Sequence, residues 1–142
     1  KIENEILKYS TYKGSQPFIS NASVQSSICY SASEIANQLD IGTIIAMTES
    51  GSSAVSISSF RPKANIIAMS PSSNVCKKLS LIWGLKSILV EEFKDTDEMI
   101  DKVEENLVKE KLLKKGSQYI IIAGVPVGIS GTTNLIRVET IH

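Results

Sequence analysis

The chain has 142 residues, a length that suits one domain, and its composition of 42% apolar and 21% charged residues is typical of a globular protein. Its 15 Lys and Arg residues balance 15 Asp and Glu residues, and this zero formal net charge argues against a nucleic-acid partner. Cys29 and Cys76 are too few for a disulfide framework, and the one histidine, His142, argues against a multi-histidine zinc site or a His-based nucleophile pair.

The sequence predicts neither a membrane-spanning segment nor a signal peptide. No stretch approaches the roughly 20 continuous apolar residues that cross a bilayer, and residues 1–8 lack the apolar core of a signal peptide. We therefore expect a cytoplasmic protein without a membrane partner. Because the sequence begins at Lys1 rather than Met, we expect a processed chain or an excised domain. We take residues 1–20, which carry a short helix-like stripe and then a Gly/Pro break, as a lead-in segment, and residues 21–142 as the domain.

Apolar periodicity predicts alternating helices and strands through the middle of the chain. A helix of small residues is expected over residues 21–40. Three short apolar runs follow without polar alternation, which indicates strands buried on both faces of a parallel sheet. These strands are residues 43–47, 65–69 and 87–90, and the stretches predicted as helices after them are 52–60, 73–83 and 96–111.

Two further strands complete the prediction. Residues 119–123 form the most apolar strand, and residues 134–141 alternate apolar with polar side chains. Strand–helix–strand alternation implies right-handed βαβ units with helices on both faces of the sheet. The connection between the last two strands is too short for a crossover helix, so the last strand should run antiparallel at an edge. The predicted fold class is α/β, a three-layer α/β/α sandwich with a mixed five-stranded sheet.

Ligands of such sheets bind beyond the carboxyl ends of the strands, and the loop after the first strand has the chemistry for an anion. Its hydroxyls and the free N–H groups of a helix start suit a phosphate, and its glycine allows close approach of the backbone. The alternative interpretation is that these hydroxyls only cap the helix. It is not a Walker loop, because no Gly-Lys-Ser/Thr follows. The candidate residues are Thr48, Glu49, Ser50, Gly51, Ser52 and Ser53.

A glycine-rich connection before the last strand is the second candidate. It holds more glycine than a tight hairpin needs and is long enough to close over a ligand held by the first loop. The alternative, which the residue types alone favour, is an ordinary surface loop. Its candidate residues are Gly124, Val125, Pro126, Val127, Gly128, Ser130, Gly131 and Thr132.

The remaining conspicuous residues have structural interpretations. We expect Arg61 to form an ion pair with a carboxylate such as Glu49, or else to reach an anion. Trp83 is expected in the core or an interface, and the acidic residues around Asp95 are explained by a helix dipole. No nucleophile–base pair, carboxylate pair or metal-ligand set emerges, so the chain looks equipped to bind rather than convert a ligand.

Three stretches together resemble the C-terminal domain of pyruvate kinase, and the last is similar to bacterial members. They are Thr-Glu-Ser-Gly-Ser-Ser-Ala at 48–54 with Phe-Arg-Pro-Lys-Ala-Asn-Ile-Ile-Ala at 60–68, Trp-Gly at 83–84, and Gly-Val-Pro-Val-Gly at 124–128 with Gly-Thr-Thr-Asn-Leu-Ile-Arg-Val at 131–138. The resemblance runs from about residue 21 to residue 141. Residues 1–12 look like the helical segment that joins this domain to the catalytic barrel.

The resemblance implies a regulatory domain. In that family the barrel, whose motifs are absent from this sequence, holds phosphoenolpyruvate, ADP, magnesium and potassium, so no cofactor is expected in this chain. The C-terminal domain carries the allosteric site and a subunit interface of the homotetramer. Members regulated by sugar phosphates hold a phosphate in the loop that matches residues 48–53 and fold the loop that matches residues 124–133 over it.

Departures from the family pattern bear on the effector. Glu49 and Ser52 replace the usual Lys and Arg of the first loop, and Glu92 and Met99 stand where eukaryotic members hold the second phosphate of fructose 1,6-bisphosphate. We therefore expect a monophosphate effector such as ribose 5-phosphate or AMP, or an empty site. The alternatives are a free-standing enzyme acting on a phosphate ester, with Ser50 or Ser52 as phosphate ligand and Glu49 as base, and a ligand-free docking module.

Overall fold

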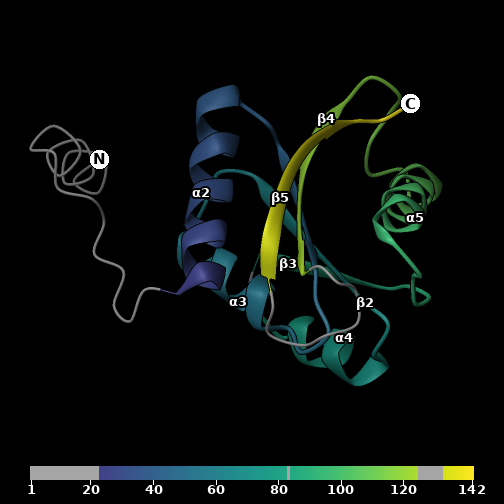
Figure 1. Cartoon of the computed structure of the whole chain (residues 1–142), viewed down its shortest axis with the longest axis horizontal. Helices are drawn as coiled ribbons and strands as arrows, with labels where there is room; N and C mark the ends of the chain where they lie inside the picture. The colour runs from purple at the N-terminus through teal and green to yellow at the C-terminus, as the bar shows by residue number, and fades with distance from the viewer. Residues whose placement is uncertain (1–22, 83, 125–132) are drawn as a thin grey trace, which may run out of the picture.

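The fold is seen in a computed structural model, which describes residues 23–82, 84–124 and 133–142 (Figure 1). The predictions for the lead-in segment and for Trp83 fall outside these residues. The elements in chain order are α2 (Val24–Leu39), β1 (Thr43–Met47), α3 (Ser52–Ser59), β2 (Asn65–Ser70), α4 (Ser73–Leu79), β3 (Leu85–Leu89), α5 (Thr96–Lys109), β4 (Gln118–Gly124) and β5 (Thr133–Thr140).

The sheet has the strand order β3-β2-β1-β4-β5. β1 pairs in parallel with β2 and with β4, and β2 pairs in parallel with β3. Among the described strands β5 pairs with β4 alone, and it runs antiparallel to β4 at one edge of the sheet. The predicted mixed five-stranded sheet with an antiparallel edge strand is therefore confirmed.

Helices cover both faces of the sheet, which confirms the three layers. The small residues of α2 pack with α3 and α4 against one face, where Ala32, Ala36 and Ile57 are fully or almost fully buried. α5 covers the other face with Met99, Val103 and other apolar side chains. Figure 1 shows α2 and α5 on opposite sides of the sheet. Burial on both faces explains why β1 and β4 are continuous apolar runs.

Several element ends differ from the prediction for local reasons. The helix predicted from residue 21 begins at Val24, because Ser23 forms a capping box with Ser26. The helix predicted over residues 73–83 ends at Leu79. The third strand begins at Leu85 rather than residue 87, because an edge strand tolerates an exposed Lys86 that interrupts the apolar run.

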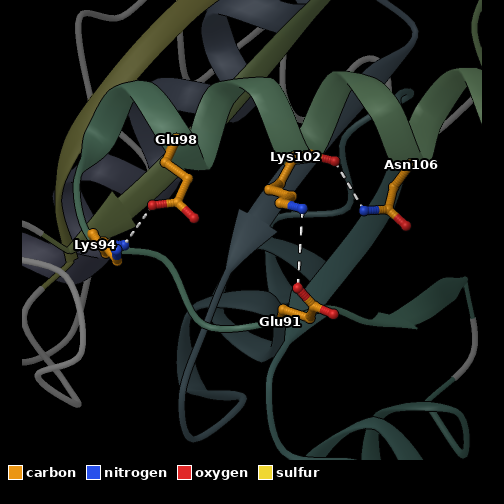
Figure 2. A network of polar contacts seen from close by, with 5 residues as sticks. All are labelled: Glu91, Lys94, Glu98, Lys102 and Asn106. Carbon is orange, nitrogen blue, oxygen red and sulfur yellow. Dashed lines mark hydrogen bonds and ion pairs between the residues drawn. The ribbon is translucent and has the colours of Figure 1, made fainter.

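The acidic segment before α5 forms a hydrogen bond and an ion pair with the first turns of that helix (Figure 2). The N-cap is Asp95, and its Oδ1 accepts a hydrogen bond of 2.8 Å from the Glu98 amide. Glu98 Oε2 in turn accepts the Lys94 amide at 3.1 Å, and Lys102 Nζ lies 3.9 Å from Glu91 Oε2. These contacts tie the β3–α5 connection to the first turns of the helix.

Replacing Asp95 by alanine is therefore expected to lower the free energy of unfolding by about 1 kcal/mol, since a lost N-cap leaves first-turn amides unpaired. Urea unfolding followed by circular dichroism measures this change. Asp97→Ala is the matched control, because Asp97 lies in the same turn without the capping bond and should cost less than about 0.5 kcal/mol. Equal losses for the two variants would contradict the capping role.

Candidate functional site

The carboxyl edge of the sheet brings the two predicted loops together. β1 and β4 are parallel neighbours that end at this edge, and the antiparallel β5 begins there. The Thr48 amide donates to the Met69 carbonyl at 3.0 Å, which continues the β1–β2 pairing beyond the end of β1. Residues 48–53, which we call the 48–53 loop, thus follow β1 beside the point where the strand order reverses, between β1 and β4, and a ligand is expected there in such a sheet.

Gly51 determines the shape of the 48–53 loop. Its φ of +92° lies in the left-handed region, and its amide donates to Thr48 Oγ1 at 2.7 Å. A Cβ at this position would lie 3.2 Å from Leu79 Cδ2, so the backbone also comes close to α4. As the N-cap of α3, Gly51 offers no side chain to the first-turn amides of that helix.

Ser53 follows in the first turn of α3 and is almost completely buried, with 1% of its surface exposed. Its hydroxyl makes no hydrogen bond to any of the described residues. The backbone carbonyl of Ser53 accepts a weak contact of 3.6 Å from Cys29 Sγ of α2. A buried hydroxyl without a partner costs about 1–3 kcal/mol, so this position is not explained by packing alone.

The other two serines of the loop form a chain of hydroxyls that ends on α2. Ser50 Oγ donates to Ser52 Oγ at 3.1 Å, and Ser52 Oγ donates to Gln25 Oε1 at 3.3 Å. Thr133 Oγ1, at the start of β5, donates to the same oxygen at 3.4 Å. Gln25 therefore joins the 48–53 loop to the end of the second candidate loop.

Gln25 was not predicted as a site residue. Nothing in the sequence marks a glutamine in the first turn of a helix, because its partners are 27 and 108 residues away.

The second candidate loop lies largely outside the described residues, and this holds for Val125, Pro126, Val127, Gly128, Ser130, Gly131 and Thr132. Its two ends are described. Gly124 ends β4 next to a register shift, and the buried Thr133 begins β5. Both ends lie at the same edge of the sheet as the 48–53 loop.

The expected ion pair between Arg61 and Glu49 does not form, and within the described part of the chain Arg61 has no ion pair. Glu49 precedes α3 and Arg61 follows it, so the two residues lie at opposite ends of a helix about 12 Å long. Arg61 is exposed and has a φ of +47°. It is therefore placed neither to neutralise Glu49 nor to reach an anion at the 48–53 loop.

Glu92 and Met99, which stand where a second phosphate would be held in eukaryotic members, lie in different surroundings. Met99 is 1% exposed and packs on the α5 face of the sheet, while Glu92 is exposed. Neither side chain is one that would bind a second phosphate.

No helix of the described residues is long and apolar enough to span a membrane.

Comparisons with known proteins match nearly all of the chain. A family model described as "Pyruvate kinase, alpha/beta domain" matches residues 26–139. The chain is 37% identical over 107 residues to a pyruvate kinase of Clostridium acetobutylicum, which covers 75% of this chain and 23% of that protein. It is 36% identical over 136 residues to a pyruvate kinase of Lactobacillus delbrueckii subsp. bulgaricus, which covers 96% of this chain and 22% of that protein.

A solved structure of a pyruvate kinase from Cryptosporidium parvum has the same fold. It matches 97% of this chain and 26% of its own chain, with a TM-score of 0.77 and 24% sequence identity. The chain thus spans about a quarter or less of the length of the relatives that it matches.

Proposed function

This chain belongs to the pyruvate kinase alpha/beta domain family, and from that premise we propose that it is the regulatory and oligomerisation domain of a pyruvate kinase. In this proposal the whole enzyme works in the cytoplasm and in glycolysis, where it transfers a phosphoryl group from phosphoenolpyruvate to ADP. A catalytic barrel outside this sequence carries that chemistry with magnesium and potassium. This chain takes no direct part in the reaction.

We propose further that the 48–53 loop binds the phosphate of an effector, and the buried, unpartnered Ser53 hydroxyl is the observation that carries this proposal. It lies in the first turn of α3, beside amides to which Gly51 offers no N-cap side chain; of these, the Ser52 amide donates to Ser50 Oγ at 3.4 Å. A phosphate would supply acceptors for the hydroxyl and for these amides together. In the proposal the glycine-rich segment 124–132 closes over the bound effector.

The charges around the loop favour a monophosphate of low affinity. The loop itself carries no Lys or Arg, and Glu49 is half-buried within it. Binding therefore relies on hydroxyl and amide donors, without the charge-assisted bonds that strengthen phosphate recognition. A sugar monophosphate or a nucleoside monophosphate, such as ribose 5-phosphate or AMP, fits this donor set better than a bisphosphate.

Replacing Ser53 by alanine tests the site through two opposite effects. The free energy of unfolding should rise by about 1 kcal/mol, because a buried unsatisfied hydroxyl is removed. Affinity for ribose 5-phosphate should fall by about five- to ten-fold, because the variant lacks one donor to the phosphate. Denaturant unfolding and calorimetric titration measure the two changes.

Ser59→Ala is the matched control for Ser53→Ala, since it removes a hydroxyl from the other end of α3 that bonds to Ser56 O at 2.6 Å. It should leave the affinity unchanged. An unchanged affinity in Ser53→Ala would contradict the phosphate site.

The proposed subunit contact uses β5, which lies at the edge of the described sheet beside β4. Arg137 Nη2 and Glu139 Oε2 pair at 3.1 Å, so these charges are satisfied within the strand. Val138 is 39% exposed between them. Such an edge suits a two-fold contact with the same strand of a second copy.

We expect weak self-association of the chain, visible by sedimentation between about 10 μM and about 1 mM. Val138→Lys should shift the equilibrium to monomer, because it places a like charge from each copy in the contact. Val108→Lys, at a similarly exposed valine of α5, should not. A strictly monomeric chain at the highest concentration would contradict the β5 contact.

The enzyme alternative requires a base next to a phosphate ligand. In the described residues Glu49 makes no hydrogen bond to Ser50 or Ser52, whose hydroxyls bond to each other and to Gln25. This arrangement favours binding over conversion. Turnover of phosphoenolpyruvate and ADP by this chain alone, above background, would count against the regulatory proposal.

A further inference from the structure

We infer that Gln25 restrains the 48–53 loop by holding the Ser52 hydroxyl, and that phosphate binding must break this hydrogen bond. The inference rests on the proposed phosphate site and concerns its regulation. Gln25 would thus set how tightly the loop binds phosphate without itself being a ligand of the phosphate.

The geometry of Gln25 supports a restraint between separate segments. Its side chain is half-buried in the first turn of α2, and its Oε1 accepts one hydrogen bond from Ser52 and one from Thr133. One carboxamide oxygen thereby links the starts of α2, α3 and β5. Both lone pairs of that oxygen are in use, so Gln25 has no further acceptor capacity at this atom.

Gln25 and a phosphate compete as acceptors of the Ser52 hydroxyl, because a hydroxyl has only one hydrogen to donate. Ser50 donates to Ser52, and Ser52 donates to Gln25, so two serines of the 48–53 loop direct their hydrogens along this chain. The third, Ser53, has no partner among the described residues. A phosphate that accepts from Ser52 must replace Gln25 as the acceptor of that hydrogen, while Ser52 Oγ can still accept from Ser50.

The same bond connects the loop to the proposed subunit contact. Gln25 lies on α2, which packs along β5, and Thr133 is the first residue of β5. Release of Ser52 leaves Gln25 bonded to Thr133 alone, so this side-chain link between α2 and β5 remains while the link from Gln25 to α3 is lost. Any effect of phosphate on self-association through this route must be matched by an equal effect of self-association on phosphate affinity.

Gln25→Met tests the restraint, because methionine has a similar shape and lacks the carboxamide oxygen. Affinity for inorganic phosphate, measured by calorimetry at constant ionic strength, should rise by about two- to ten-fold, which corresponds to one released hydrogen bond. In a Ser52→Ala background the same change should have no effect on the affinity, because the restrained hydroxyl is absent. Gln38→Met, at an exposed glutamine of the same helix, is the matched control and should bind phosphate as the wild type does.

The outcomes separate this inference from the proposed function. Phosphate binding by the wild type with an unchanged or weaker affinity in Gln25→Met would overturn the restraint and leave the phosphate site standing. Binding that tightens in Gln25→Met but equally in the Ser52→Ala background would overturn it too. A loss of measurable binding in every variant, wild type included, would overturn the phosphate site and the restraint together.

Discussion

Replacing Gly51 by alanine is expected to lower the free energy of unfolding by about 2 kcal/mol and to weaken phosphate binding by about ten-fold or more. The φ of +92° costs any residue with a Cβ about 1–2 kcal/mol, and the new Cβ would crowd Leu79 at 3.2 Å. Relief of that crowding moves the Gly51 amide away from Thr48 and displaces the first turn of α3, which holds the Ser53 hydroxyl.

Gly116→Ala is the control that separates backbone strain from the effect at the site. Gly116 has a similar φ of +88°, and nothing lies within 4 Å of the position of a Cβ there. This variant should lose about 1 kcal/mol of stability and keep the wild-type phosphate affinity. Denaturant unfolding and calorimetric titration of both variants provide the comparison. The same phosphate affinity in both would contradict the role of Gly51 in shaping the site.

A second large effect is expected at alkaline pH, where Tyr119 should lower the free energy of unfolding. Its ring is fully buried, and its hydroxyl donates to Glu104 Oε1 at 3.2 Å. Burial first, and then the negative charges of Glu104 and Glu139, raise the pKa of Tyr119 well above its ordinary value of 10.0. The folded chain therefore keeps the proton at a pH at which the unfolded chain releases it.

The sign of the pH dependence follows from this difference in pKa. Below about pH 10 the phenol is neutral in both states, so its contribution to stability is fully present. Above that pH only the unfolded state ionises, and the free energy of unfolding should fall by about 1.4 kcal/mol for each further pH unit. Tyr119→Phe should remove this part of the alkaline loss.

Urea unfolding of the wild type and of Tyr119→Phe at a series of pH values between about 8 and about 11 measures the effect. The same series with Tyr30→Phe measures the alkaline loss that is due to a second tyrosine, since burial and Glu34 also raise the pKa of Tyr30. If the wild type and Tyr119→Phe lose stability in parallel, the buried hydroxyl is not responsible.

The centre of the sheet was predictable from the sequence because β1, β2 and β4 are buried on both faces. Such strands are continuous apolar runs, as at Ile44–Ile45 and Ile120–Ile122, and the short final connection already implied an antiparallel edge strand. Helix ends were less predictable. Ser23 competes with its neighbours as a cap, and the choice between them depends on a side-chain bond to Ser26 that no composition rule specifies.

The position of the candidate site was also predictable, and its internal contacts were not. Topology places the 48–53 loop at the carboxyl edge, as the sequence indicates. The burial of Ser53 and the contacts of Gln25 depend on how α2, α3 and β5 pack. The sequence does not indicate these contacts, because Gln25 is 27 and 108 residues away from its two partners. The expected pair of Arg61 with Glu49 was wrong because the length of α3 keeps the two residues apart.

The most direct test of the phosphate site is a titration of the isotope-labelled chain with ribose 5-phosphate, followed by backbone amide shifts. We expect the largest shifts at the amides of Gly51, Ser52 and Ser53, with smaller ones at Gln25 and Thr133, which the hydroxyl chain connects to them. Largest shifts at the opposite edge of the sheet, around Asn65 and Lys86, would contradict it.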